Sequence, residues 1–190
     1  NGTASYNTIS GCTVSGAQTT PTVPPADLAP QPLPITQATI DGWKADAEAG
    51  GTTAGDVVVS GTQTIGPRKI TGKLTVTNGS TLIVSGTLWV VGDMVFSNNS
   101  IIRLISSYGT LSGVVISDAK IDVQNGASIS GSGNPASFLM VLAAKDSTSE
   151  ELISVDNNST GAIYYAGKGW IKFSNNAAAK EGTAYGIRLD

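Results

Sequence analysis

The sequence lacks histidine, holds one cysteine (Cys12) and has few charged residues. Histidine is the commonest general base and metal ligand, so its absence removes the side chain on which most catalytic and metal sites depend. A single cysteine cannot form a disulfide within the chain or build a thiolate metal site. Charged residues make up 13% of the 190 residues, and the net charge is −3 without a basic stripe. We therefore expect no enzyme activity, no cofactor, no metal and no nucleic-acid partner.

Long apolar runs are missing as well. No run approaches the roughly 18 apolar residues that a membrane-spanning helix needs. No charged and then apolar leader segment follows Asn1. We therefore expect no membrane span in this stretch, and we expect any targeting or anchoring segment to lie upstream of it.

Short β-branched runs separated by brief turns of Asn, Gly and Ser are abundant. They follow one another closely between Lys73 and Leu104, and each run is too short to stand alone. A similar turn phrase recurs around five residues: Asn78, Asn98, Asn125, Asn157 and Asn175. The spacing between them varies from 18 to 32 residues, which indicates stacked coils of unequal length. We predict an all-β fold over 51–190: a single-stranded parallel β-helix, with a right-handed coil expected.

Two weaker segments open the chain. Residues 1–18 set a few apolar positions among Ser, Thr and Gly, which predicts partial N-terminal coils. Six of the eight prolines fall between Thr19 and Pro34. Proline has no N–H for a β-ladder and favours an extended path, so 19–35 is predicted to be a strap or a linker.

The segment 36–50 gives the one convincing helix signal. Thr36 can cap its start, and Gly50-Gly51 can end it. Three apolar residues at helical spacing form one stripe: Ile40, Trp43 and Ala47. We expect this stripe to pack on the side of the β-helix or over one end. The wholly apolar run Phe138–Leu142 reads as a strand covered on both faces, and the helix is the natural cover.

The recurring Asn residues have a structural interpretation. Asn tolerates a left-handed backbone, and its amide can bond to a like amide one coil away. Asn78, Asn98, Asn125, Asn157 and Asn175 are therefore predicted to form an internal ladder of turn residues.

Aromatic residues near the end of the chain suggest a binding function instead. Tyr164 and Tyr165 are adjacent, so one of them faces outward if both lie on a strand. Together with Trp170 and Trp89 they are candidates for stacking on a sugar ring.

A polysaccharide-active enzyme is a weaker alternative. Such enzymes need clustered carboxylates on adjacent coils, and Asp118 and Asp122, with Lys120 and Arg103, come nearest to such a cluster. Alternate strand residues point outward, however, so these positions also describe an ordinary solvated surface.

An ice-binding face is the other weak alternative. Flat threonine rows would serve it, and Thr62/Thr64 and Thr75/Thr77 form the start of one. The following coils carry Asp93, Arg103 and Asp122 at the corresponding places, so the row ends early.

Four phrases carry a resemblance to a known family: LPITQATIDGWKADAEAGG, KLTVTNGSTLIVSGTLWVVGDMVFSNNSIIRL, SYGTLSGVVISDAKIDVQNGASISGSGNPASFLMVL and NNSTGAIYYAGKGWIKFSNNAAAKEGTAYGIRLD. They resemble the uncharacterised β-helix domain of bacterial type IV pilus-assembly-like (pilin-like) surface proteins, from about Leu33 to Asp190. The resemblance implies an extracellular or cell-surface location and a structural or adhesive role, and it brings no catalytic residues. The membrane-anchoring helix of that family is not in this sequence.

These observations together predict an extracellular structural protein that forms or decorates a cell-surface filament or pilus-like appendage. The ends of a coil present unpaired backbone groups that invite another chain. We therefore expect self-association by end-to-end stacking, or binding to pilus components. The alternative is a carbohydrate-binding adhesin with surface glycans as its ligands.

Overall fold

The computed structural model describes residues 4–5, 15–19 and 33–190, and it divides the chain into two units, 1–34 and 35–190. In the first unit, β1 (Ala4–Ser5) pairs in parallel with β2 (Gln18–Thr19). Residues 1–3 and 6–14 of the predicted partial coils, including Cys12, lie outside the described residues. So do residues 20–32 of the predicted strap.

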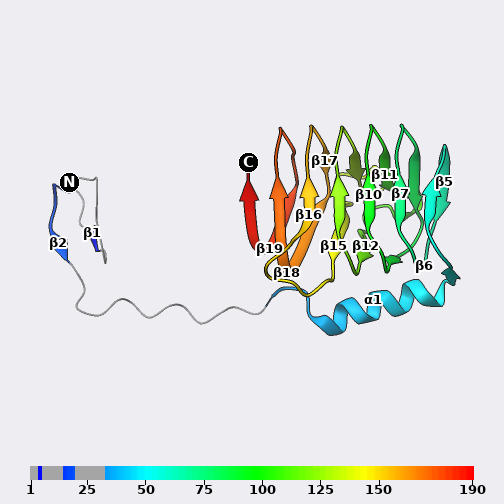
Figure 1. Ribbon diagram of the computed structural model, residues 1–190, viewed down its shortest axis with the longest axis horizontal. Helices are drawn as coiled ribbons and strands as arrows, with labels where there is room; N and C mark the ends of the chain where they lie inside the picture. Colours follow the sequence, from blue (N-terminus) through cyan, green and yellow to red (C-terminus); the bar gives the residue numbers. More distant parts are fainter. Residues whose placement is uncertain (1–3, 6–14, 20–32) are drawn as a thin grey trace. The chain divides into compact units, whose positions relative to one another are not determined.

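The second unit is a parallel β-helix, which confirms the predicted fold class (Figure 1). Each turn, called a coil below, adds one strand to each of three faces. The first face holds β3 (Thr52–Thr53), β6 (Arg68–Ile70), β9 (Leu88–Val90), β12 (Gly113–Ser117) and β15 (Leu139–Ala143). The second holds β4 (Val57–Val59), β7 (Leu74–Val76), β10 (Met94–Phe96), β13 (Ile121–Val123) and β16 (Glu151–Val155). The third holds β5 (Thr62–Ile65), β8 (Thr81–Val84), β11 (Ile101–Leu104), β14 (Ser128–Ser130) and β17 (Thr160–Gly161).

The last two coils are built differently. Strands β18 (Ile163–Phe173) and β19 (Glu181–Leu189) each run across the first two faces, with a shift in their pairing register between Ala166 and Trp170. Strand β18 is continuous over 11 residues. In an earlier coil the same two faces hold two separate strands, β6 and β7. A Cβ at Gly72 would lie 2.3 Å from the Asp56 carboxylate, so glycine lets the corner between β6 and β7 lie close to the preceding coil.

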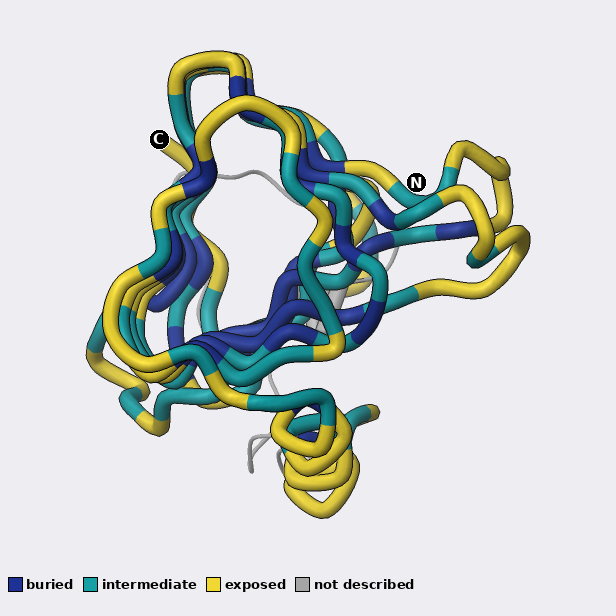
Figure 2. The backbone as a smooth tube through the Cα atoms, turned by 90° about the vertical axis from the view of Figure 1, so that its right-hand side faces the viewer, coloured by how far each residue is buried: buried dark blue, intermediate teal, exposed yellow. Residues whose placement is uncertain are grey.

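The core lies inside the coil, where like residues stack in register. One inward column contains Leu74, Met94, Ile121, Ile153 and Ile171, all fully buried. Figure 2 looks along the coil and shows buried positions recurring at matching places in successive coils. Because each coil covers the apolar side of its neighbour, no single coil needs a core of its own. The handedness of the coil stays a prediction.

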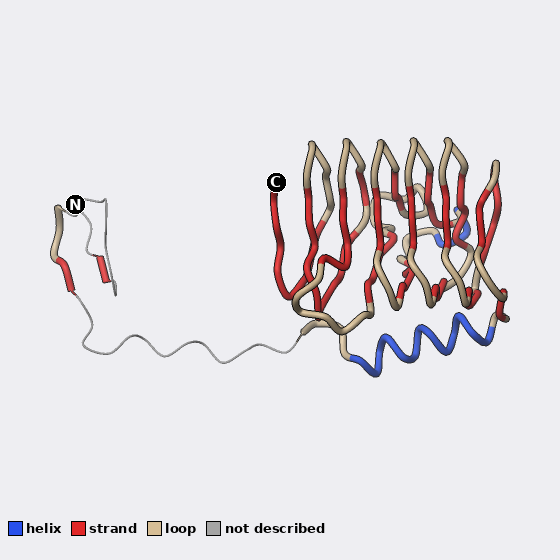
Figure 3. Tube along the Cα trace, viewed as in Figure 1, coloured by secondary structure: helices blue, strands red, loops and turns tan. Residues whose placement is uncertain are grey.

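Helix α1 (Gln37–Ala49) lies along the side of the stack (Figure 3). The Thr36 side chain caps it by accepting a hydrogen bond from the N–H of Thr39, at 3.2 Å. At 1.5 Å per residue its 13 residues are about 20 Å long, equal to about four strand spacings of 4.8 Å. One helix therefore braces several coils. Among the described residues, no helix is long and apolar enough to cross a membrane.

The helix covers one outward-facing column of the first face. Lys69, Trp89, Ile116, Leu142 and Tyr165 follow one another in register along this column. A buried apolar cluster joins the helix to this wall: Ile40, Val114, Ile116, Leu142 and Tyr165. The apolar strand that the sequence predicted to be covered on both faces is therefore covered by α1, because Leu142 lies in that cluster.

Candidate functional site

The corner between the second and third faces repeats one four-residue turn in five successive coils. In each turn the two central residues have positive φ, between 51° and 76°. Asn and Gly adopt this conformation with the least strain. The carbonyl of the first residue accepts a hydrogen bond from the N–H of the fourth, for example Thr77 from Ser80 at 3.1 Å. The five turns hold Asn78-Gly79, Asn98-Asn99, Asn125-Gly126, Asn157-Asn158 and Asn175-Asn176.

Four of the five predicted Asn residues join in a ladder of side-chain amides. The Nδ2 of Asn98 donates to Asn78 at 3.4 Å, that of Asn125 to Asn98 at 3.2 Å, and that of Asn157 to Asn125 at 3.0 Å. These amides lie at a solvent-facing corner, so the prediction of an internal ladder is wrong in that respect. A corner turn points its side chains away from the coil, which is why the ladder runs along the outside.

Asn175 leaves the ladder. Its Nδ2 donates to Oδ1 of Asp156, in the preceding coil, at 2.7 Å. This hydrogen bond, with smaller contributions from its other donors and Lys172, holds the pKa of the Asp156 carboxyl below its usual range. A carboxylate therefore ends the series of amides.

The residue after each ladder Asn also belongs to the corner, and sequence reasoning missed it. The N–H of Gly79 donates to the carbonyl of Asn98 at 2.9 Å, and that of Gly126 donates to Asn157 at 2.9 Å. The signal was present as the pairs Asn-Gly and Asn-Asn, which are typical of turns with two residues at positive φ. This corner holds coils together and uses its polar groups to do so.

The structure corrects the proposed stacking surface at Tyr164 and Tyr165. The two side chains do point in opposite directions, as their adjacency on a strand predicts. Tyr164 points into the core and is fully buried, whereas Tyr165 points outward under α1 and is 4% exposed. The Tyr165 hydroxyl donates to the carbonyl of Ile35 at 3.2 Å. Neither ring offers a face to a ligand.

The two tryptophans of that hypothesis are half-buried. The Trp170 indole N–H donates to the carbonyl of Thr148 at 2.7 Å, and its ring meets Tyr185 edge-on. Trp89 lies under the ammonium group of Lys69, whose Nζ is 4.0 Å from the ring centroid. Its indole N–H donates to Asp118 at 2.8 Å. Lys44 of α1 pairs with the same Asp118 and its Nζ lies 5.4 Å from the Trp89 ring centroid, so Trp89 helps to hold α1 to the wall.

The residues named for an enzyme fall in different places. Asp118 pairs with Lys44 of α1 at 2.5 Å and accepts from Trp89. Asp122 lies on β13, and partial burial raises the pKa of its carboxyl, helped by the nearby Asp93. Arg103 lies on β11, in the other sheet. Among the described residues, no three acidic or cysteine side chains lie close enough to hold a metal ion.

The threonines named for an ice-binding face do not continue into a row. Thr62 and Thr81 are register partners, but Ile101 follows them in the next coil. Thr64 is followed by Ile83 and then Arg103.

A pair of stacked loops is the most elaborate feature of the coil surface. They occupy the corner between the third and first faces, at 105–112 and 131–138, and the chain elsewhere crosses this corner in three residues or fewer. Figure 2 shows loops projecting from one side of the coil. The first loop includes the short 3₁₀ helix η1 (Ser106–Tyr108). Long loops on a rigid scaffold are common carriers of function.

Hydrogen bonds fasten the two loops to each other. The hydroxyl of Ser132 donates to the carbonyl of Gly109 at 2.5 Å, and that of Ser137 donates to Leu111 at 2.6 Å. The N–H of Phe138 donates to the hydroxyl of Ser112 at 3.1 Å. The pair therefore forms one ordered wall rather than two independent loops.

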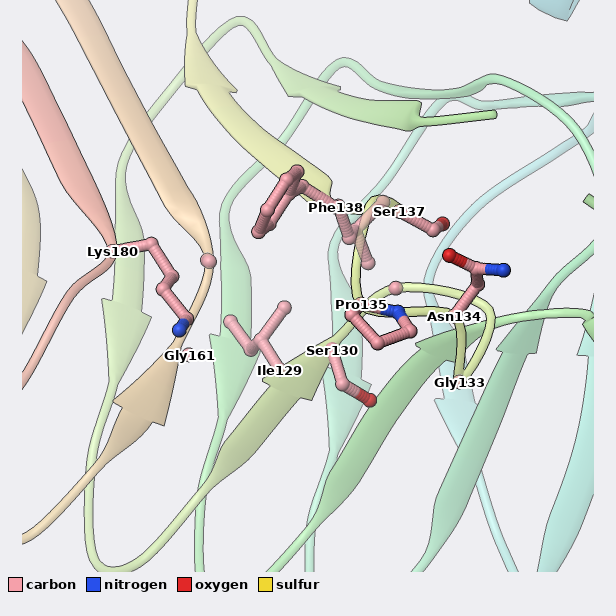
Figure 4. Close-up of a pocket in the computed structure, with 12 residues that line it drawn as sticks. Ile129, Ser130, Gly133, Asn134, Pro135, Ser137, Phe138, Gly161 and Lys180 are labelled. Carbon is pink, nitrogen blue, oxygen red and sulfur yellow. The ribbon is translucent and has the colours of Figure 1, made fainter. Parts of the chain in front are cut away.

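One hollow lies on the β17 side of this wall, with a volume of about 310 Å³. Figure 4 shows Asn134 and Pro135 on one side of it, Lys180 and Gly161 on the other, and Ile129 between them. A Cβ at Gly161 would lie within van der Waals overlap of the Ile129 carbonyl oxygen, so glycine is needed where β17 approaches β14. The lining is mainly apolar, with Lys180 as its single cation.

A second hollow lies on the other side of the wall, facing α1. It has a volume of about 260 Å³ and is lined by the rings of Trp43, Tyr108 and Phe138. The sequence did not predict that these three aromatic residues lie together, because they come from three segments far apart in the chain. The only signal was the unusual length of the two loops.

Comparisons of the chain with models of protein families, with curated proteins and with solved structures gave no match.

Proposed function

We propose that this chain is an extracellular structural protein whose β-helix decorates a cell-surface filament or pilus-like appendage. The observation that carries the proposal is that the polar residues of the Asn corner form hydrogen bonds between neighbouring coils. The Asn corner links coil to coil, and α1 clamps several coils together. Such a module is a stiff support. The resemblance to the β-helix domain of pilus-assembly-like surface proteins points to the same role.

The N-terminal end of the β-helix, where Gln63 lies on β5 and Arg68 on β6, favours decoration over end-to-end stacking. Arg68 takes the register position that Leu88 and Val115 fill inside the following coils, and Gln63 takes the one filled by Leu82. The hollow at this end, about 350 Å³, is lined by Arg68. Inward-pointing charges and polar groups at an edge oppose the addition of another strand. Self-association through this end is therefore disfavoured.

Replacing both Gln63 and Arg68 tests whether these polar side chains prevent association through the N-terminal end of the β-helix. The double variant Gln63→Leu with Arg68→Leu should associate into larger particles in size-exclusion chromatography with light scattering, because its end would be apolar. Arg103→Leu is the matched control and should behave like the unchanged protein. Filaments formed by the unchanged chain through this end would contradict such a role of the two side chains and favour stacking.

Location is the direct test of the function. Immunogold labelling of intact cells that produce the protein should place it on surface appendages. Label confined to the cell interior would overturn the proposal.

A further inference from the structure

The hollow between α1 and the stacked loops is built as a ligand groove. Trp43 reaches it from the helix, Tyr108 from the first loop and Phe138 from the end of the second. Val114, Met140 and Ile163 add apolar side chains from successive strands of the first face. Three aromatic rings, all half-buried, thus border one space of about 260 Å³.

Both walls of this aromatic groove are fixed before any ligand arrives. On the helix side, Lys44, the residue next to Trp43, pairs with Asp118 at 2.5 Å. On the loop side, the hydrogen bond from the Phe138 N–H to Ser112 holds the second loop against the first. A preformed site saves the entropy of ordering its side chains on binding. The groove therefore does not depend on a rearrangement.

The polar groups of the groove are uncharged. Thr87, Ser112 and Tyr108 bring hydroxyls that can donate or accept hydrogen bonds. Among the described residues that line the groove, none carries a charge. An ionic ligand would lose its hydration there without gaining a counter-charge. A ligand with hydroxyls along its edges and apolar C–H faces suits both the rings and the hydroxyls.

We propose that this groove binds an uncharged sugar, as a short segment of a neutral glycan. This inference goes beyond the structural role proposed above, and either proposal can fail without the other. It also moves the aromatic site away from Tyr164 and Tyr165, which are buried. The small volume of the groove fits one or two sugar rings, with the remaining chain of the glycan outside.

Binding is measured by isothermal titration calorimetry of the whole chain with four probes: cellotetraose, maltotetraose, chitotetraose and the anionic trigalacturonate. At least one uncharged probe should bind, and trigalacturonate should not. If no uncharged probe binds at millimolar concentration, or if only trigalacturonate binds, the proposal is overturned.

Variants assign the binding to the groove. Tyr108→Ala should weaken it about tenfold, the effect expected for losing one aromatic contact. Thr87→Val keeps the shape of the side chain and should weaken it less, and it serves as the test if Tyr108→Ala fails to fold. Trp170→Ala is the matched aromatic control outside the groove and should leave binding unchanged. Binding lost in Trp170→Ala but kept in both groove variants would refute the assignment.

Discussion

The neighbouring residues Tyr164 and Tyr165 show that the direction of a side chain on a strand decides its environment. Tyr164 is enclosed by the core, and its hydroxyl has no hydrogen-bond partner in the part of the chain that the structure describes. Burial also raises the pKa of this hydroxyl above its ordinary value. Tyr165 has its hydroxyl bonded to Ile35. The alternation was predictable from the strand pattern, but the cover over Tyr165 was not, because α1, which ends at Ala49, provides it.

The two hydroxyls should respond in opposite ways to removal. Tyr164→Phe should raise the free energy of unfolding by about 1 kcal/mol, because a buried unsatisfied hydroxyl disappears. Tyr165→Phe should lower it by about 1 kcal/mol, because a hydrogen bond is lost. Urea denaturation of both variants measures the difference. Equal effects would mean that the Tyr164 hydroxyl has a partner.

The Asn ladder can be divided into its backbone and its amide contributions at Asn125. Asn125→Ala loses both amide bonds and places at φ 55° a residue that tolerates the left-handed backbone less well than asparagine does. It should cost about 2–3 kcal/mol of stability. Asn125→Gly keeps the turn and loses only the amide bonds, so it should cost about 1 kcal/mol. If the two variants are equally stable in thermal or urea unfolding, the positive φ contributes nothing.

Helix α1 was the element most completely predictable from the sequence. Its cap, its length and its apolar stripe follow from local rules that need no knowledge of the coil. Ile40 and Ala47 are buried and Trp43 is half-buried. Its place along the side of the stack, rather than over an end, depends on the outward column of the first face. That column is assembled from five coils of unequal length, so its register was not readable in advance.

Close approach of the helix to the wall is testable at Ala47, which is fully buried. Ala47→Leu should destabilise the protein by about 1–3 kcal/mol, because there is no space for a larger side chain. Ala45→Leu, on the exposed side of the same helix, is the control and should change stability by less than about 0.5 kcal/mol. A tolerated Ala47→Leu would show that the helix is only loosely attached.

The charged loop 144–150 is held in place by hydrogen bonds and ion pairs. Glu150 accepts hydrogen bonds from Lys145 and Ser147, each at 2.8 Å. Asp146 pairs with Lys168 at 2.7 Å. Local sequence showed the charges but not their partners, since Lys168 comes from the following coil.

Acid should release this loop. The hydrogen bonds from Lys145 and Ser147 lower the pKa of Glu150 to about 2, whereas the unfolded chain has a value of about 4.3. A lowered folded pKa stabilises the folded loop above about pH 4.3, and this contribution is lost as the pH falls toward 2. An NMR titration of the Glu150 carboxyl should show the lowered pKa. In Glu150→Gln the loss of stability between about pH 4.3 and 2 that this carboxyl causes should disappear. A midpoint near 4.3 would contradict the pairing.

For the whole molecule, the repeated turns and short runs were enough to predict a parallel β-helix. They did not predict the binding groove, because it forms where two long loops meet the helix. The core positions repeat from coil to coil, so the sequence predicts them. The two long loops and the column under the helix each occur once, so no repeat predicts them. What repeats in a solenoid is predictable from one sequence, and what is unique to a coil is not.

The position of α1 also has a mechanical consequence. The chain enters the β-helix through this helix, and just before it the carbonyl of Ile35 accepts a hydrogen bond from Tyr165 of β18. Tension applied from the N-terminal side would therefore load this hydrogen bond and α1 before it loads the coils closer to β6. The helix would peel from the wall in the direction of β6, with the coils still closed. Under a sudden pull the contact between α1 and the wall would give way first, while the β-helix stays intact.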